Sequence, residues 1–147
     1  MDQERHDIAI LMVEDDEAIR KMLGIFINRK FPDMPIHFAE NGKRGIELFE
    51  AYAPAIVITD LVMPEMDGAE MASTIKTMKS DVKLIVVTGY GSMKAIEIFR
   101  SIGTNAFLTK PLEIKALISA LEQCIAEIES PIPSAQASQQ LAGCPTP

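Results

Sequence analysis

The sequence predicts an α/β protein with a doubly wound, five-stranded parallel sheet and five helices. Short apolar runs alternate along the chain with longer segments in which apolar residues recur at helical spacing. Two runs, 56–58 and 84–87, are continuously apolar, which is typical of strands covered on both faces. Strict alternation of strands and helices implies right-handed crossovers between parallel strands, with helices on both faces of the sheet.

The expected strands are short, and four of them stand out clearly from their surroundings. The second in chain order is weaker, because its apolar residues are fewer. The five strands are expected at residues 8–13, 35–39, 55–59, 84–88 and 106–109.

The expected helices follow these strands in turn. The first should end near Lys30, and five residues are expected on its buried face: Ile19, Met22, Leu23, Phe26 and Ile27. The next three helices are expected at about 43–51, 68–78 and 92–101. The third of these carries more apolar residues (Ile96, Ile98, Phe99) than one core stripe needs, which leaves a homodimer or partner surface open. The last helix has the clearest stripe, made of Leu117, Ile118, Leu121, Ile125 and Ile128. Pro32, Pro54 and Gly103 mark helix ends.

Length and composition predict one domain and an appendage. We assign residues 1–130 to the domain, and 131–147, with four of the nine prolines, to a tail or linker. The net charge of −7 argues against direct nucleic-acid binding. No apolar run approaches the roughly 20 residues of a membrane span, and no signal peptide opens the chain. Cys124 and Cys144 have neither zinc-clip nor redox-pair spacing, so a cytoplasmic, reducing location without membrane contact is expected.

Polar residues follow four of the five strands where each strand ends. The first strand runs into four consecutive acids, 14–17, and the third ends in Thr59 and Asp60. The fourth ends in Thr88 and Gly89, and the fifth in Thr109, Lys110 and Pro111. Because the carboxyl ends of parallel strands share one edge of the sheet, these groups are expected to meet there.

Those residue types suit phosphoryl transfer. Clustered carboxylates repel one another, and Mg²⁺, which prefers oxygen ligands, would resolve that conflict at Glu14, Asp15 and Asp60. Positioning and charge neutralisation supply most of the catalysis of phosphoryl transfer, and Lys110 and Thr88 could contribute both. Asp60 ends the most apolar strand and is least crowded by other acids, so it is the expected nucleophile.

Each of these residues also has a purely structural interpretation. An acidic run before a helix commonly caps it and complements its dipole, and an Asp after a strand is usually a turn residue. A Lys before Pro is usually solvated. The functional interpretation depends on the conjunction of four strand ends with complementary chemistry.

At these residues the chain resembles the receiver domains of two-component response regulators. The resemblance covers about residues 8–129 and is carried by 10–16, 58–68, 86–89 and 108–111, of which the Asp60–Gly68 stretch is the most specific. It implies a flavodoxin-like receiver topology. It also implies that Asp60 accepts a phosphoryl group from a histidine kinase or a histidine phosphotransfer protein.

The resemblance implies roles for further residues. Mg²⁺ would be held by Asp15, Asp60, Glu14 and the backbone carbonyl of Val62. Thr88 and Lys110 would bind the phosphoryl oxygens, and Thr88 would act with the aromatic Phe107 as a switch. The switch would alter the face formed by the fourth helix, fifth strand and fifth helix, where an output domain or target protein docks. The family's Lys–Pro bond is usually cis, which Pro111 permits.

Three alternatives remain beside this interpretation. A flavodoxin-like redox protein would need a phosphate-binding loop after the first strand, where this chain has four acids. A phosphatase with an Asp nucleophile would need a second Asp where Val62 stands, so turnover catalysis is not expected beyond self-phosphorylation and slow dephosphorylation. The third alternative is a protein-interaction module that keeps the fold without phosphorylation. The chain could be a stand-alone receiver or one excised from a larger regulator, and the linker-like composition of residues 131–147 favours the second.

Overall fold

The computed structural model describes residues 8–60, 68–89 and 93–130. A single parallel sheet has the strand order β2-β1-β3-β4-β5, the doubly wound order predicted from the sequence. Its strands are β1 (Ile10–Val13), β2 (Ile36–Ala39), β3 (Ile56–Asp60), β4 (Lys83–Thr88) and β5 (Ala106–Thr109). The predicted boundaries therefore differ by two residues at most. The tail assigned to 131–147 lies outside the described residues.

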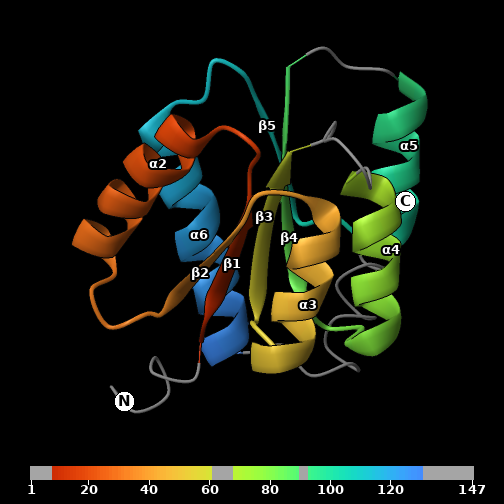
Figure 1. Ribbon diagram of the computed structural model, residues 1–147, viewed down its shortest axis with the longest axis horizontal. Helices are drawn as coiled ribbons and strands as arrows, with labels where there is room; N and C mark the ends of the chain where they lie inside the picture. The colour runs from red at the N-terminus through yellow and green to blue at the C-terminus, as the bar shows by residue number, and fades with distance from the viewer. Residues whose placement is uncertain (1–7, 61–67, 90–92, 131–147) are drawn as a thin grey trace, which may run out of the picture.

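Helices cover both faces of the sheet (Figure 1). They are α2 (Glu17–Lys30), α3 (Gly42–Tyr52), α4 (Gly68–Met78), α5 (Met93–Ile102) and α6 (Ile114–Glu129). Helices α2 and α6 contact each other on one face, whereas α3, α4 and α5 form a contiguous row on the other. The buried apolar side chains form two separate layers, one between the sheet and each group of helices.

Strand residues divide between the two layers by the alternation of side chains along a strand. Met12 and Ile58 point into the layer under α2 and α6, whereas Val13 and Val57 point into the other. The continuously apolar strands β3 and β4 lie inside the sheet and are buried along almost their whole length. This double coverage is what their sequence predicted.

The predicted buried face of α2 is wrong at two positions. Met22 and Phe26 are 46% and 38% exposed, whereas Leu23, Gly24 and Ile27 are buried. The reason lies in the neighbours of α2, which has α6 on one side but only the short edge strand β2 on the other. A helix at the border of a sheet has a narrower buried stripe than its sequence pattern allows.

The surplus of apolar residues on α5 is divided between core and surface. Phe99 is fully buried, Ile96 is partly buried, and Ile98 is 41% exposed. The core accounts for Phe99, and the exposed Ile98 leaves a small apolar surface on α5.

Candidate functional site

Carboxylates from two strand ends converge at the carboxyl edge of the sheet. One carboxylate oxygen from each of Glu14, Asp15 and Asp60 lies within 4.8 Å of the others. Glu14 and Asp15 directly follow β1, and Asp60 ends the neighbouring strand β3, with Val13 paired to Thr59. The parallel register therefore brings Asp60 together with acids that are 45 and 46 positions away in the sequence.

The loop after β1 is held in place by α2. The side chain of Asp16 caps the helix by accepting from the Ile19 backbone N–H at 3.0 Å. The Arg20 guanidinium donates to the carbonyl of Glu14 at 2.8 Å and more weakly to that of Asp15 at 3.4 Å. The Asp16 N–H in turn donates to the Glu14 carboxylate at 3.0 Å. These contacts fix the backbone from which two of the clustered carboxylates project.

Lys110 pairs directly with Asp60. Its Nζ donates to Asp60 Oδ2 at 2.6 Å, and their side chains are 37% and 9% exposed. The lysine stem passes beside Gly89, where an added Cβ would lie 3.6 Å from Lys110 Cδ. The Lys110–Pro111 peptide bond is cis. The ammonium therefore reaches from the end of β5, past the end of β4, to the carboxylate on β3.

The pKa values of two groups reflect this crowding. Burial is the largest influence on Glu14 and raises the pKa of its carboxyl, which the nearby Asp15 and Asp60 raise further. Burial alone would lower the pKa of Lys110, but the hydrogen bond and charge of Asp60, together with Glu14 and Asp15, outweigh it and raise this pKa. The cluster thus favours a cation, and Lys110 supplies only one positive charge for three acids.

Of the other predicted site residues, Thr88 lies at this edge and Phe107 lies two residues before the end of β5. Thr88 is buried and ends β4, one residue beyond Val87, which is paired with Asp60. Phe107 lies on β5 and is partly buried against the layer under α3, α4 and α5. Its ring centroid is 5.9 Å from the guanidinium carbon of Arg100 on α5, a cation–π geometry. Val62, the predicted backbone ligand, lies outside the described residues.

The acidic cluster fits a magnesium ion. Ligand oxygens at about 2.0–2.1 Å from Mg²⁺ lie up to about 4.2 Å apart across an octahedron. The carboxylate oxygens, within 4.8 Å of one another, match this spacing after a small closure or with water between one acid and the ion. Mg²⁺ commonly keeps several waters and binds through one or two carboxylates and phosphate oxygens.

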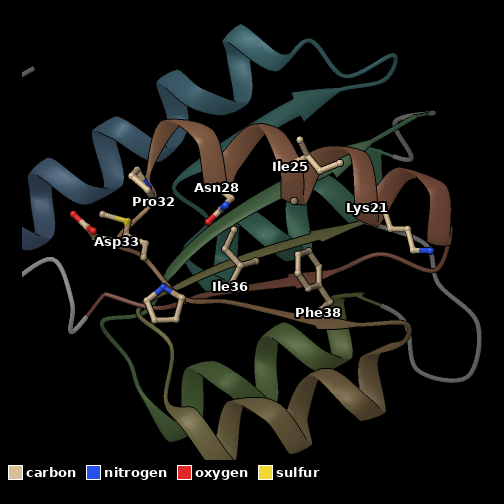
Figure 2. Close-up of a pocket in the computed structure, with 10 residues that line it drawn as sticks. Lys21, Ile25, Asn28, Pro32, Asp33, Ile36 and Phe38 are labelled. Carbon is tan, nitrogen blue, oxygen red and sulfur yellow. The ribbon is translucent and has the colours of Figure 1, made fainter.

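Two hollows open on the α2 side of the molecule. One, of about 290 Å³, includes Glu14, Asp60 and Lys110 in its lining. The other, of about 680 Å³, is a groove between α2 and the edge strand β2, lined by Ile25, Asn28, Ile36 and Phe38 among others (Figure 2). Lys21 and Asp33 lie toward opposite ends of this groove. Only the smaller hollow contains predicted site residues.

Sequence reasoning missed Arg20 and Gly89. Nothing in the sequence around Arg20 distinguishes it from an ordinary helix-surface cation, because its contacts depend on how the preceding loop folds back. The sequence marks Gly89 only as the end of a strand. Its place beside the Lys110 stem depends on the pairing of Thr88 with Thr109, which puts β4 and β5 side by side.

The fold and the site define a class: a doubly wound α/β domain with an acidic, lysine-paired site at the carboxyl edge of its sheet. The chain belongs to the response regulator receiver domain family, whose sequence model matches residues 10–122. It is therefore a receiver domain of two-component signalling, and such domains are signalling domains rather than classical enzymes.

Two individual relatives and one solved structure support this family assignment. The chain is 33% identical over 121 residues to the uncharacterized transcriptional regulatory protein YesN of Bacillus subtilis, covering 82% of this chain and 33% of that protein. It is 28% identical over 116 residues to the chemotaxis protein CheY of Halobacterium salinarum, covering 79% and 95%. The N-terminal domain of an uncharacterized protein from Wolinella succinogenes superimposes with a TM-score of 0.74 at 35% identity, covering 80% and 93%.

The chain spans different shares of its relatives. It covers about a third of YesN and 56% of the transcriptional regulatory protein FixJ of Rhizobium meliloti, but nearly all of the Halobacterium CheY. Among the helices in the described ranges, none is both long and apolar enough to cross a membrane.

Proposed function

We propose that this receiver is a magnesium-dependent phosphorylation switch in which Asp60 accepts the phosphoryl group. The observation that carries the proposal is the 2.6 Å contact between Lys110 Nζ and Asp60 Oδ2 beside the carboxylates of Glu14 and Asp15. Asp60 is 8% exposed and lines a hollow at the sheet edge, through which a phosphoryl donor would reach it.

Mg²⁺ would be held by Asp15 and Asp60, by Glu14 through water and by the Val62 carbonyl, and would neutralise charge on the phosphoryl oxygens. The Asp60 carboxylate attacks phosphorus, the P–N bond to the donor's histidine breaks, and an acyl phosphate forms as the histidine regains its electron pair. In this proposal Lys110 would bind a phosphoryl oxygen while it stays near Asp60, and Thr88 would donate its hydroxyl to another.

The proposed output is a change in the α5–β5–α6 face. Thr88 would follow the phosphoryl group, and Phe107, on the strand paired with β4, would respond to that movement. The Arg100 guanidinium lies over the Phe107 ring and links α5 to β5, so a movement of the ring would shift α5 as well. The proposed upstream partner is a histidine kinase or a histidine phosphotransfer protein. The proposed downstream partner is an output domain or target protein. Homodimerisation is one proposed way in which the change would be transmitted. No direct nucleic-acid contact is proposed for this domain.

Phosphorylation by a small-molecule donor tests the acceptor. The chain is incubated with acetyl phosphate and Mg²⁺, and intact mass spectrometry counts added phosphoryl groups. We expect one group on the unmodified chain and on Asp81→Asn, whose exposed carboxylate pairs with Lys79 away from the site. We expect none on Asp60→Asn, and none when Mg²⁺ is chelated.

Beryllofluoride with Mg²⁺ provides the second measurement, because it mimics a phosphoryl group on a carboxylate. Backbone NMR shifts should change at Thr88 and along α5, β5 and α6. An unmodified chain that neither gains mass nor responds to beryllofluoride would instead be a protein-interaction module that works without phosphorylation.

A further inference from the structure

The 290 Å³ cavity beside Asp60 has an apolar interior that phosphoryl transfer does not use. Met12 of β1 is paired with Ile58 of β3, and the two lie two residues before Glu14 and Asp60 in the sequence, so they sit about 6.6 Å further from the sheet edge. Ile19 and Leu23 of α2 close one side, and Leu112 after β5 closes another. The cavity therefore has a charged end at the sheet edge and an apolar end within the core layer.

The interior of this cavity is suited to an apolar ligand. Among the described residues, no buried side-chain nitrogen or oxygen lacks a hydrogen-bond partner. An apolar cavity of about 150 Å³ holds one benzene ring, so 290 Å³ has room for one or two aromatic rings. The partly exposed Met22 at the border has a flexible side chain that can adapt to different ring shapes.

The charged end selects the sign of a ligand's head group. Glu14, Asp15 and Asp60 carry three formal negative charges, and Lys110 carries one positive charge. In the absence of a divalent cation the excess is negative, and because the carboxylate oxygens lie within 4.8 Å of one another, an ammonium group would relieve their mutual repulsion.

We propose that this cavity is a binding site for small aromatic ammonium ions. The ring system occupies the apolar end between α2 and the sheet, and the ammonium lies at Glu14 and Asp60. Binding does not require Asp60 to accept a phosphoryl group, so this site stands independently of the proposed switch. Since ammonium and Mg²⁺ would use the same carboxylates, each excludes the other, and such a ligand would inhibit Mg²⁺-dependent chemistry.

A matched pair of probes tests the proposal without Mg²⁺ present. Tryptamine carries an ammonium on a two-carbon linker from indole, and indole-3-propionate carries a carboxylate on a linker of the same length. Methyl NMR spectra are recorded during titration of the full chain with each probe. Tryptamine should shift the methyl signals of Ile19, Ile58 and Leu112 saturably, with a dissociation constant of about 1 mM or lower. The carboxylate should bind at least about tenfold more weakly.

Two variants of the same kind locate the site. Ile19→Phe adds volume inside the cavity and should weaken tryptamine binding about tenfold or more. Ile25→Phe makes the same change on the same helix, at a position 56% exposed in the other groove, and should leave binding unchanged. The probe comparison uses the unmodified chain, so it remains decisive if Ile19→Phe does not fold. Equal binding of both probes, shifts confined to Ile25 and Ile36, or no saturable shift would each overturn the proposal.

Discussion

Lys110 and Asp60 are 50 residues apart in the sequence, and Lys110 Nζ lies 2.6 Å from Asp60 Oδ2. The pair joins the ends of β5 and β3 across the end of β4. Lys110 supplies one positive charge against the three formal negative charges of Glu14, Asp15 and Asp60. The cluster therefore keeps a net negative formal charge, which favours a divalent cation there.

Removing the Lys110 charge should affect metal binding and phosphorylation in opposite directions. In Lys110→Met the three carboxylates lose their cationic neighbour, so Mg²⁺ should bind about fivefold more tightly or better. Phosphorylation by acetyl phosphate should fall sharply, because the ammonium no longer stabilises the transferring group. Isothermal titration and mass spectrometry measure the two effects. Lys115→Met, an exposed lysine on α6, is the control, and weaker Mg²⁺ binding by Lys110→Met would contradict this account.

Arg20 should act as a positioning residue for the metal site. Arg20→Ala removes the two hydrogen bonds that hold the carbonyls of Glu14 and Asp15. The loop can then sample other conformations, and Mg²⁺ affinity should fall about tenfold. Lys21→Ala, one residue on, removes a charge whose partner is the exposed Glu17 and should change affinity little.

A second variant, Arg20→Lys, separates the positioning role of Arg20 from a simple loss of its charge. Arg20→Lys keeps the charge but not the fork of donors, so it should restore only a minor part of the affinity. Full rescue by Arg20→Lys would show that long-range charge, rather than the two hydrogen bonds, supports the site.

Two glycines should respond differently to alanine. A Cβ at Gly45 would lie 2.8 Å from Met71 Sδ and 3.1 Å from Val13 Cγ2, both buried side chains, so Gly45→Ala should lower the free energy of unfolding by about 1–3 kcal/mol. A Cβ at Gly24 would meet only the Phe38 ring, which is 40% exposed and can move aside. Its gain in helix propensity of about 1 kcal/mol should then make Gly24→Ala neutral or mildly stabilising. Urea unfolding compares them, and equal destabilisation would contradict the prediction.

Cys124 should make stability fall at high pH. Burial raises the pKa of its thiol from 9.0 to about 11. Between these values the unfolded chain loses the thiol proton while the folded chain keeps it, so the free energy of unfolding decreases as pH rises. The limiting slope is about 1.4 kcal/mol per pH unit.

Urea unfolding from pH 8 to 10.5, in a Cys144→Ser background, measures this slope. Cys124→Ala is the control, because the other groups that titrate in this range remain in it. The contribution of Cys124 is fully present below pH 9, so the two proteins should diverge only above that pH. Parallel profiles throughout would mean that the thiol is as accessible when folded as when unfolded.

The sequence by itself determined the fold class, the five strands, and the edge of the sheet at which the polar residues meet. Continuous apolar runs can be buried on both faces only in a parallel sheet with helices on each side, so their order along the chain was sufficient. Glu14, Asp15, Asp60 and Lys110 were predicted from their places at strand ends, and the structure brings these four together.

Only the tertiary structure decided which residues support that edge and what lies beneath it. The contacts of Arg20, the passage of Lys110 beside Gly89 and the exposure of Met22 and Phe26 depend on how α2 lies against the border of the sheet. The apolar cavity under Asp60 likewise arises where β1, α2, β3, β4 and the segment after β5 come together. Periodicity specifies which face of an element is apolar, but the neighbours that cover it, and the space left between them, are fixed by packing in three dimensions.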